Sequence, residues 1–199
     1  MCKWRCAMSG AIDTIVTISG ASGAGKTTLA TALARLYGGG VVPTITTRPR
    51  RAGESRSAYE FISQRALEQR DAQGDILWTV LVGEHSYAVS RTAFYQAAGE
   101  TGGLAMIVVT PEGHAQARQH WRTQVGHFVQ LHLEHPGNIE LARRLDERGD
   151  SDQVIGRRMQ EARQIEFEIQ KYLYRQTVPA GSVAAMVQVA SKLIDALTP

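Results

Sequence analysis

The order of apolar and polar residues along the chain predicts strands that alternate with helices. The run Thr14 to Ile18 is short, apolar and β-branched, and Ser19-Gly20 ends it, so we expect a buried strand there. A glycine-rich turn follows. Leucines then recur at helical spacing until Gly38 to Gly40 stop the pattern, which predicts a helix. The chain therefore begins with a strand, a glycine-rich loop and a helix.

The rest of the chain continues this alternation. Further strands are expected at Val41–Val42, Leu104–Val109 and Phe128–Leu133, with another strand signal at Tyr59–Phe61. Helices are expected at Gln64–Gln73, Gly113–Trp121, Ile139–Arg148, Gln153–Tyr172 and Val183–Leu197. Alternating strands and helices indicate an α/β fold with a mostly parallel sheet flanked by helices. Residues 44–99 are polar and mixed, with the apolar runs ILWTVLVG and SYAVS, and are interpreted as an insertion into this fold.

Composition narrows the class of protein further. A chain of 199 residues has the size of one domain, and its net charge of +3 is weaker than nucleic-acid binders usually carry. The first residues lack a signal-peptide core, and no stretch approaches the ~20 apolar residues of a membrane span. Cys2 and Cys6 form neither a disulfide framework nor a zinc site by themselves. We expect a cytoplasmic protein that binds neither nucleic acid nor membrane; the sequence carries no indication of oligomeric state.

The segment from Gly20 to Thr27 reads GASGAGKT and matches the phosphate-binding pattern GxxxxGK[ST] in full. The glycines let the backbone wrap a phosphate with its N–H groups pointing inward, at the positive end of the helix that follows. Lys26 can reach the β- and γ-phosphates of ATP, and the Thr27 hydroxyl can hold Mg²⁺. The expected ATP-binding residues are Gly20, Ala21, Ser22, Gly23, Ala24, Gly25, Lys26, Thr27 and Thr28. The loop alone does not separate kinases from GTPases or motor ATPases.

The segment Thr46 to Glu54, TTRPRRAGE, resembles the TTRxPRxGE motif of guanylate kinases, although the proline of that family falls here at Arg50. The resemblance spans Ile15 to Leu197. It implies that Arg48 and Arg51 clamp the phosphate of an acceptor, because guanidinium forks suit phosphate oxygens. It also implies acceptor contacts from Thr44, Tyr59 and Tyr87.

A second basic cluster, RRLDERGDSDQVIGRRM from Arg143 to Met159, resembles the mobile lid of guanylate kinases with one residue fewer. The resemblance implies that Arg148 and Arg158 neutralise the phosphoryl group in transit, and Arg144 shares a helix face with Arg148. With Lys26 and Arg48, these two arginines are the expected catalytic residues.

The resemblance also divides the chain. One kinase domain, 1–199, is expected, with a core of about 12–43, 100–140 and 159–199. The acceptor-binding insertion is expected at about 44–99, and the lid at about 141–158. The implied reaction moves the γ-phosphoryl group of ATP, with Mg²⁺, to the phosphate of a small molecule.

The resemblance fails at the positions where guanylate kinases recognise guanine. Leu77, Val108 and Thr110 stand where that family has acidic residues, and the segment Gln176 to Ala180 lacks its adenine-side motif. A carboxylate is needed to accept from the ring N–H and the amino group of guanine. The lost aspartate also removes an outer-sphere Mg²⁺ anchor. We therefore expect a changed acceptor, or GMP held by substitute acids such as Glu84 or Glu112.

Several alternatives remain at this stage. Ribose 1,5-bisphosphate phosphokinases share the scaffold and lack the guanine acids. A non-catalytic binding module is a second alternative, and the intact loop disfavours it. A GTPase is disfavoured because no N-K-x-D motif occurs, and action on nucleic-acid ends because no basic stripe remains. His127, His132 and His135 are interpreted as ordinary polar positions, His85 as a weak substrate candidate, and Glu161, Glu166 and Glu168 as a solvated face or partners of arginines.

Overall fold

The computed structural model describes residues 13–50, 59–99, 104–121, 126–170 and 176–198. Its larger sheet has five parallel strands in the order β2-β7-β1-β8-β9. These strands are β1 (Thr14–Gly20), β2 (Gly40–Val42), β7 (Leu104–Val108), β8 (His127–Leu133) and β9 (Gln176–Val178). The fold is thus the predicted α/β arrangement, with a smaller mixed sheet beside it.

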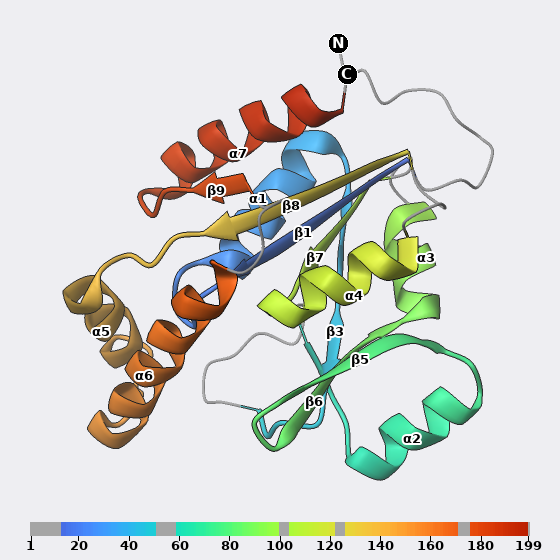
Figure 1. Cartoon of the computed structure of the whole chain (residues 1–199), viewed down its shortest axis with the longest axis horizontal. Helices are drawn as coiled ribbons and strands as arrows, with labels where there is room; N and C mark the ends of the chain where they lie inside the picture. Colours follow the sequence, from blue (N-terminus) through green and yellow to red (C-terminus); the bar gives the residue numbers. More distant parts are fainter. Residues whose placement is uncertain (1–12, 51–58, 100–103, 122–125, 171–175, 199) are drawn as a thin grey trace.

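Helices cover both faces of this sheet (Figure 1). On one face lie α1 (Lys26–Tyr37) and α7 (Val183–Leu197), and on the other lie α3 (Arg91–Gly99) and α4 (Pro111–Trp121). Because successive side chains of a strand point to opposite faces, β1 and β7 supply both cores. Val16 and Met106 pack toward α1, whereas Ile15 and Ile107 pack toward α3 and α4. Burial on both faces explains why β1 is buried along its whole length.

The second sheet is built from residues 44–90, inside the segment interpreted as an insertion. Its strands lie in the order β4-β3-β6-β5, with β3 and β4 parallel and the other pairs antiparallel. They are β3 (Thr44–Thr46), β4 (Tyr59–Phe61), β5 (Ile76–Val82) and β6 (His85–Ser90), and α2 (Gln64–Ala72) follows β4. Among the residues described, the sequence reading missed β3, α3 and β9, which are short or weakly patterned.

Aromatic contacts join the second sheet to the body of the protein. Trp78 of β5 meets Trp121 of α4 edge to face, with ring centroids 4.9 Å apart. Phe94 of α3 stacks on the other side of Trp121 at 4.2 Å. Such aromatic pairs add about 0.5–1.5 kcal/mol beyond their buried area. They fix β5, and with it one wall of the space between the sheets.

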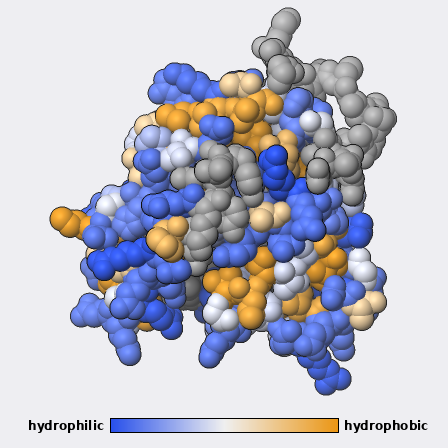
Figure 2. Space-filling view, in the orientation of Figure 1, coloured by the Kyte–Doolittle hydropathy of each residue, from blue (hydrophilic) through white to orange (hydrophobic). Residues whose placement is uncertain are grey.

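The remaining two helices stand at the carboxyl ends of the parallel strands, where the arrow of β8 points toward them (Figure 1). They are α5 (Asn138–Asp146) and α6 (Asp152–Ile169). Leu141 and Leu145 of α5 are fully buried in the core cluster that also contains the loop residue Ala24. The face around α5 and α6 is mostly hydrophilic, whereas apolar residues gather over α7 (Figure 2). Among the described helices, none is both long and apolar enough to cross a membrane.

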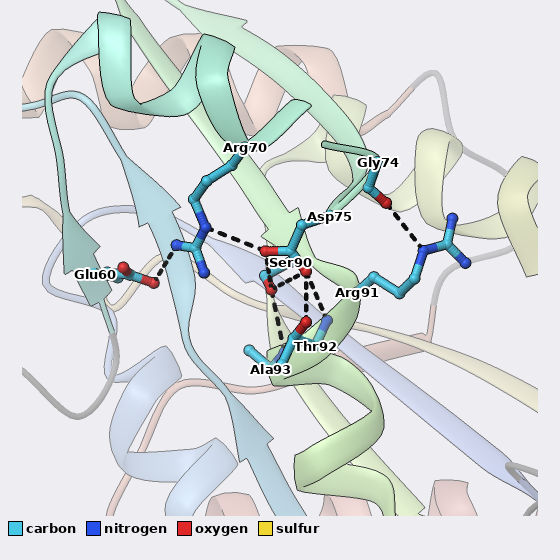
Figure 3. A network of polar contacts seen from close by, with 8 residues as sticks. All are labelled: Glu60, Arg70, Gly74, Asp75, Ser90, Arg91, Thr92 and Ala93. Carbon is cyan, nitrogen blue, oxygen red and sulfur yellow. Dashed lines mark hydrogen bonds and ion pairs between the residues drawn. The ribbon is translucent and has the colours of Figure 1, made fainter. Parts of the chain in front are cut away.

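A half-buried carboxylate ties the second sheet together (Figure 3). Asp75 accepts hydrogen bonds from the backbone and hydroxyl of Thr92 at 3.0 and 2.7 Å, from Ser90 at 2.9 Å, and from Arg70 at 3.1 Å. Arg70 also donates to Glu60 of β4 at 2.8 Å. Burial alone would raise the pKa of Asp75, but these donors outweigh it and hold the pKa below its ordinary value.

We predict that Asp75→Asn lowers the free energy of unfolding by about 2 kcal/mol at pH 7, because several donors lose a charged acceptor. The folded pKa lies below the unfolded one. The stabilisation is therefore fully present above the unfolded value of about 4 and disappears as the pH falls through the folded value. Urea denaturation from pH 7 to pH 3 measures this, with the exposed Asp71→Asn as control. A difference that does not change with pH would contradict this origin.

Candidate active site

The turn between β1 and α1 is shaped to surround an anion. Gly20 and Gly25 have φ of 143° and 106°, a backbone region that side chains disfavour. A Cβ on Gly20 would lie 2.5 Å from the carbonyl oxygen of Leu133, so β8 closes against the loop only with glycine there. The first turn of α1 carries no acidic residue, and its N–H groups face the loop with a partial positive charge.

Lys26 holds the loop in this form. Its ammonium donates to the carbonyl oxygens of Gly20 and Ala21, both at 2.8 Å. The side chain lines a cavity over the loop together with the hydroxyl-bearing Thr27. The other lining residues are Ser22, Gly23, Gly25, Thr28, Tyr59, Arg144, Glu147 and Arg148. Six of the nine expected loop residues line this cavity, whereas Gly20 lines a second cleft, and Ala21 and Ala24 are fully buried.

Arginines of α5, of α6 and of the turn between these helices lie close to the phosphate loop. Arg158 is 1% exposed and donates to the Ser22 hydroxyl at 3.3 Å, and it pairs with Asp150 at 3.3 Å. Arg144 donates to the carbonyl oxygen of Ala24 at 3.2 Å. Arg148 lines the cavity while half exposed, 3.6 Å from Asp150. Both arginines expected from the sequence therefore lie near the loop, and Arg144 contacts it more directly than Arg148.

Acidic partners hold these arginines in place. Glu140 accepts from Arg143 at 2.8 Å and from Arg144 at 2.6 Å. Hydrogen bonds from Arg143, then Arg144, lower the pKa of Glu140 to about 2, so this carboxylate stays charged at neutral pH. The guanidinium of Arg144 is thereby oriented toward the loop before any ligand binds.

A second cleft opens between the two sheets and shares Ser22, Lys26 and Tyr59 with the cavity over the loop. Arg48 lies in it, 8% exposed, with its Nε 3.3 Å from the hydroxyl of Tyr87. Its guanidinium also stands 5.6 Å from the ring centre of Tyr59 and donates to Pro49 O at 2.9 Å. Lys26 and Arg48 therefore line one continuous space, and Arg48, Tyr59 and Tyr87 gather as the sequence predicted.

Apart from Gly20, Ser22, Lys26, Arg48, Tyr59 and Tyr87, the lining of this cleft is mostly apolar and forms its apolar wall. This wall consists of Thr44, Trp78, Val80, Val82, Ala88, Val89, Val108, Val109, Thr110, Gly113, Glu161 and Ile165. Thr44 is turned to Val108, to whose carbonyl oxygen its hydroxyl donates at 3.1 Å. Val108 and Thr110 line the cleft at positions where the sequence led us to expect lost acids. Leu77 does not line it, because it falls at a register shift in β5 and packs into the aromatic core.

The carboxylate in this cleft is one that the sequence analysis undervalued. Glu84 and Glu112 are absent from the described lining, whereas Glu161 contributes to it from α6. Glu161 pairs with Arg157 at 3.7 Å, as expected of a helix face, yet it also faces the cleft. Glu161 follows Arg158 by three residues and precedes Ile165 by four. This helical spacing is the signal that places the three side chains on one side of α6.

Other expected positions fall elsewhere. Arg51, with Gly53 and Glu54 of its motif, lies outside the described residues, so its role stays a prediction. His85 does not line either cleft in the part of the chain that is described. The described residues contain no group of three or more potential metal ligands among His, Cys, Asp and Glu. A cation here would depend on Thr27 and on oxygens of a ligand.

The fold and this site define a P-loop type α/β protein, with a phosphate-binding turn at the carboxyl edge of a parallel sheet. The guanylate kinase family model matches residues 13–190, and the chain belongs to the guanylate kinase family.

Similar proteins agree with this assignment. The guanylate kinase of Alkalilimnicola ehrlichii is 36% identical over 152 residues, which cover 75% of this chain and 72% of that one. The Escherichia coli guanylate kinase is 33% identical over 154 residues, with the same coverage. The crystal structure of guanylate kinase from Anaplasma phagocytophilum has a TM-score of 0.68 at 20% identity, covering 94% of this chain and 86% of that one. A Sinorhizobium meliloti gluconokinase has a TM-score of 0.51 at 14% identity, covering 94% and 95%. The two structures show likeness of fold.

The close approach of Gly20 to β8 yields a prediction. Gly20→Ala should lower the free energy of unfolding by about 2 kcal/mol or more, because the new Cβ meets backbone and φ is strained. Gly156→Ala is the matched control: nothing lies within 4 Å of its Cβ position in α6, so it should add about 0.5–1 kcal/mol. Chemical denaturation of both variants measures this. Equal stabilities for the two alanine variants would refute the packing argument.

Proposed function

We propose that this protein transfers the γ-phosphoryl group of ATP to the phosphate of a small acceptor. The observation that carries the proposal is the shared space lined by Lys26 and Arg48. Lys26 belongs to a phosphate loop, and Arg48, held by Tyr87, lines the same cleft. Two phosphate groups bound by Lys26 and by Arg48 would meet within this cleft, as in-line transfer requires.

In this proposal the loop residues 20–28 grip the triphosphate of ATP. Backbone N–H groups at the start of α1 and the ammonium of Lys26 bind its oxygens, which replace the carbonyls of Gly20 and Ala21 as partners of Lys26. One hydroxyl on a cavity wall fits Mg²⁺, because this ion usually takes few protein ligands together with phosphates and waters. Thr27 would hold it, and the ion would neutralise charge on the β- and γ-oxygens.

The arginines of α5 and α6 complete the charge balance. Arg158 and Arg148 approach the loop from residues 141–158, which we assign as a lid over the reaction, and Arg144 adds a third guanidinium. Arg51 is assigned with Arg48 to the acceptor phosphate on sequence alone. The attacking oxygen of a phosphate is already anionic, so no general base is required. Catalysis then consists of positioning and charge neutralisation.

The apolar wall of the cleft supports an acceptor that differs from the GMP of guanylate kinases. Guanine presents an N–H and an amino group on one edge, and burying these donors without partners costs several kcal/mol. The walls there are valines and Trp78, with Glu161 of α6 as the described carboxylate. The basic residues described in the lining are Lys26 and Arg48, so a second phosphate on the apolar wall, as in ribose 1,5-bisphosphate, would lack a counter-charge of its own. We therefore favour a nucleoside monophosphate whose base is selected mainly by shape, over both GMP alone and ribose 1,5-bisphosphate.

Lys26→Ala tests the reaction. The variant should lose at least about a hundredfold in kcat, because the developing charge on the transferred group loses its nearest cation. A coupled assay of ADP formation with an acceptor measures this, and Lys192→Ala on the exposed side of α7 is the control. Turnover at the parent rate in Lys26→Ala would end this assignment. An absence of acceptor-dependent turnover in the parent would favour a non-catalytic binding module.

The choice of acceptor is tested by assaying all ribo- and deoxyribonucleoside monophosphates and ribose 1,5-bisphosphate. We expect turnover of several nucleoside monophosphates, with kcat/KM values within about tenfold of one another, because apolar walls discriminate weakly. Glu161→Gln should change this ranking little. If the parent protein used GMP alone and Glu161→Gln lost this activity, the result would instead show that Glu161 recognises guanine.

A further inference from the structure

A row of polar side chains is buried beneath the phosphate loop. Thr17 and Ser19 of β1 stand opposite Gln130 and His132 of β8 in the parallel register. All four are at most 2% exposed, and the neighbouring side chains of β8, such as Leu131, pack on the other face of the sheet. Polar residues so deep in a sheet need hydrogen-bond partners, which makes their connections informative.

These residues form one continuous chain through His114 of α4, which is fully buried. His114 lies with Nδ1 2.8 Å from the Thr17 hydroxyl and Nε2 2.6 Å from the Ser19 hydroxyl. Ser19 lies 3.1 Å from Nδ1 of His132, whose Nε2 is 3.2 Å from a carboxylate oxygen of Glu166 in α6. Glu166, expected to be solvated or to pair with an arginine, pairs instead with a buried histidine.

The end of this chain fixes the direction of its last hydrogen bond. A carboxylate only accepts, so Nε2 of His132 donates to Glu166. At the other end, the Thr17 hydroxyl donates to the carbonyl oxygen of Val129 at 3.3 Å. Burial, followed by the nearby His132, lowers the pKa of His114 to about 3, which keeps this ring neutral. Gln130 joins the chain by donating to the carbonyl oxygen of His114 at 3.2 Å.

Two members of the chain, Ser19 and Glu166, lie next to the two halves of the proposed catalytic apparatus. Ser19 directly precedes Gly20, the first residue of the phosphate loop. Glu166 belongs to α6, which also carries Arg158 against Ser22 of the loop and Glu161 and Ile165 on the wall of the acceptor cleft. Helix α6 is therefore fastened to β1 and its loop at two points, near its start by Arg158 and near its end by Glu166.

We propose that His132 and Glu166 are positioning residues that hold α6 in register with the phosphate loop, so that Arg158 meets the phosphoryl group in transit. This inference rests on the proposed function for its catalytic part, whereas the fastening of α6 can be tested without turnover. The two residues act through α6 and touch neither substrate. Removal of the Glu166 carboxylate leaves the buried Nε2–H donor of His132 without its acceptor. It also releases the last turns of α6.

Glu166→Ala, Glu166→Gln and Arg163→Ala test the proposal in the full chain. Glutamine keeps an oxygen that accepts from His132, whereas alanine does not; Arg163 is exposed on the same helix and serves as control. We expect kcat to fall about tenfold in Glu166→Ala with KM for ATP unchanged, and to recover to within about twofold of the parent in Glu166→Gln. Arg163→Ala should match the parent.

Hydrogen exchange of the same variants separates this inference from the proposed function. Backbone amides of α6 should exchange at least about tenfold faster in Glu166→Ala, while those of β7 and α7 stay at the parent rate. Parent exchange rates in α6 of Glu166→Ala would overturn the proposal, as would a uniform rise across the whole chain, which indicates only lost stability. If the parent protein transferred no phosphoryl group, the proposed function would be refuted. The hydrogen-exchange result would still decide whether the hydrogen-bond chain holds α6 in place.

Discussion

For the proposed phosphoryl transfer, electrostatic repulsion between phosphate groups is the constraint that the arrangement of this protein has to meet. Two phosphate dianions that approach within a few ångströms repel each other strongly once water is excluded. The structure sets Lys26 between the cavity over the loop and the cleft between the sheets, where it lines both. Arg48 stands beyond it on one side, and the arginines of α5 and α6 on the other. The parallel sheet makes this possible, because it ends β1 and β8 at the edge from which the loop and α5 continue.

Concentrating so many cations creates a second difficulty, since they also repel one another before a ligand binds. The structure counters this with partners that phosphate oxygens can replace. Lys26 donates to loop carbonyls, Arg144 to Glu140 and Ala24, and Arg158 to Ser22 beside Asp150. These contacts orient the cations before a ligand binds. They also lower the affinity for a phosphate ligand, because each hydrogen bond broken on binding has to be replaced by a new one. Preorganised charge of this kind contributes most to catalysis where water is excluded.

The elements that local pattern controls were predictable from sequence. The strand, loop and helix around Lys26 followed from spacing, and the position of Arg158 near the loop followed from the resemblance to the guanylate kinase lid. Tertiary pairing decided the rest. Next to a register shift in β5, Leu77 packs against the aromatic core, and Trp78 both belongs to that core and lines the cleft. The helix α3 has no strong apolar period, and its start depends on Ser90, whose hydroxyl accepts from Ala93 N. The histidine chain joins residues 95 and 113 positions apart, which single-sequence spacing does not reveal.

The same geometry explains how the phosphate-binding residues and the apolar wall can vary separately. Arg48 and Tyr87 line the cleft together with Lys26, and both belong to or follow paired strands of the second sheet. The apolar wall draws residues from β5 and β6, from the end of β7 and from α6. In the proposed function, valine in place of a carboxylate at position 108 changes which donors a base can satisfy without moving the phosphate grip. Because α6 supplies both Glu161 at that wall and Arg158 at the loop, its placement links the choice of acceptor to the chemistry of transfer.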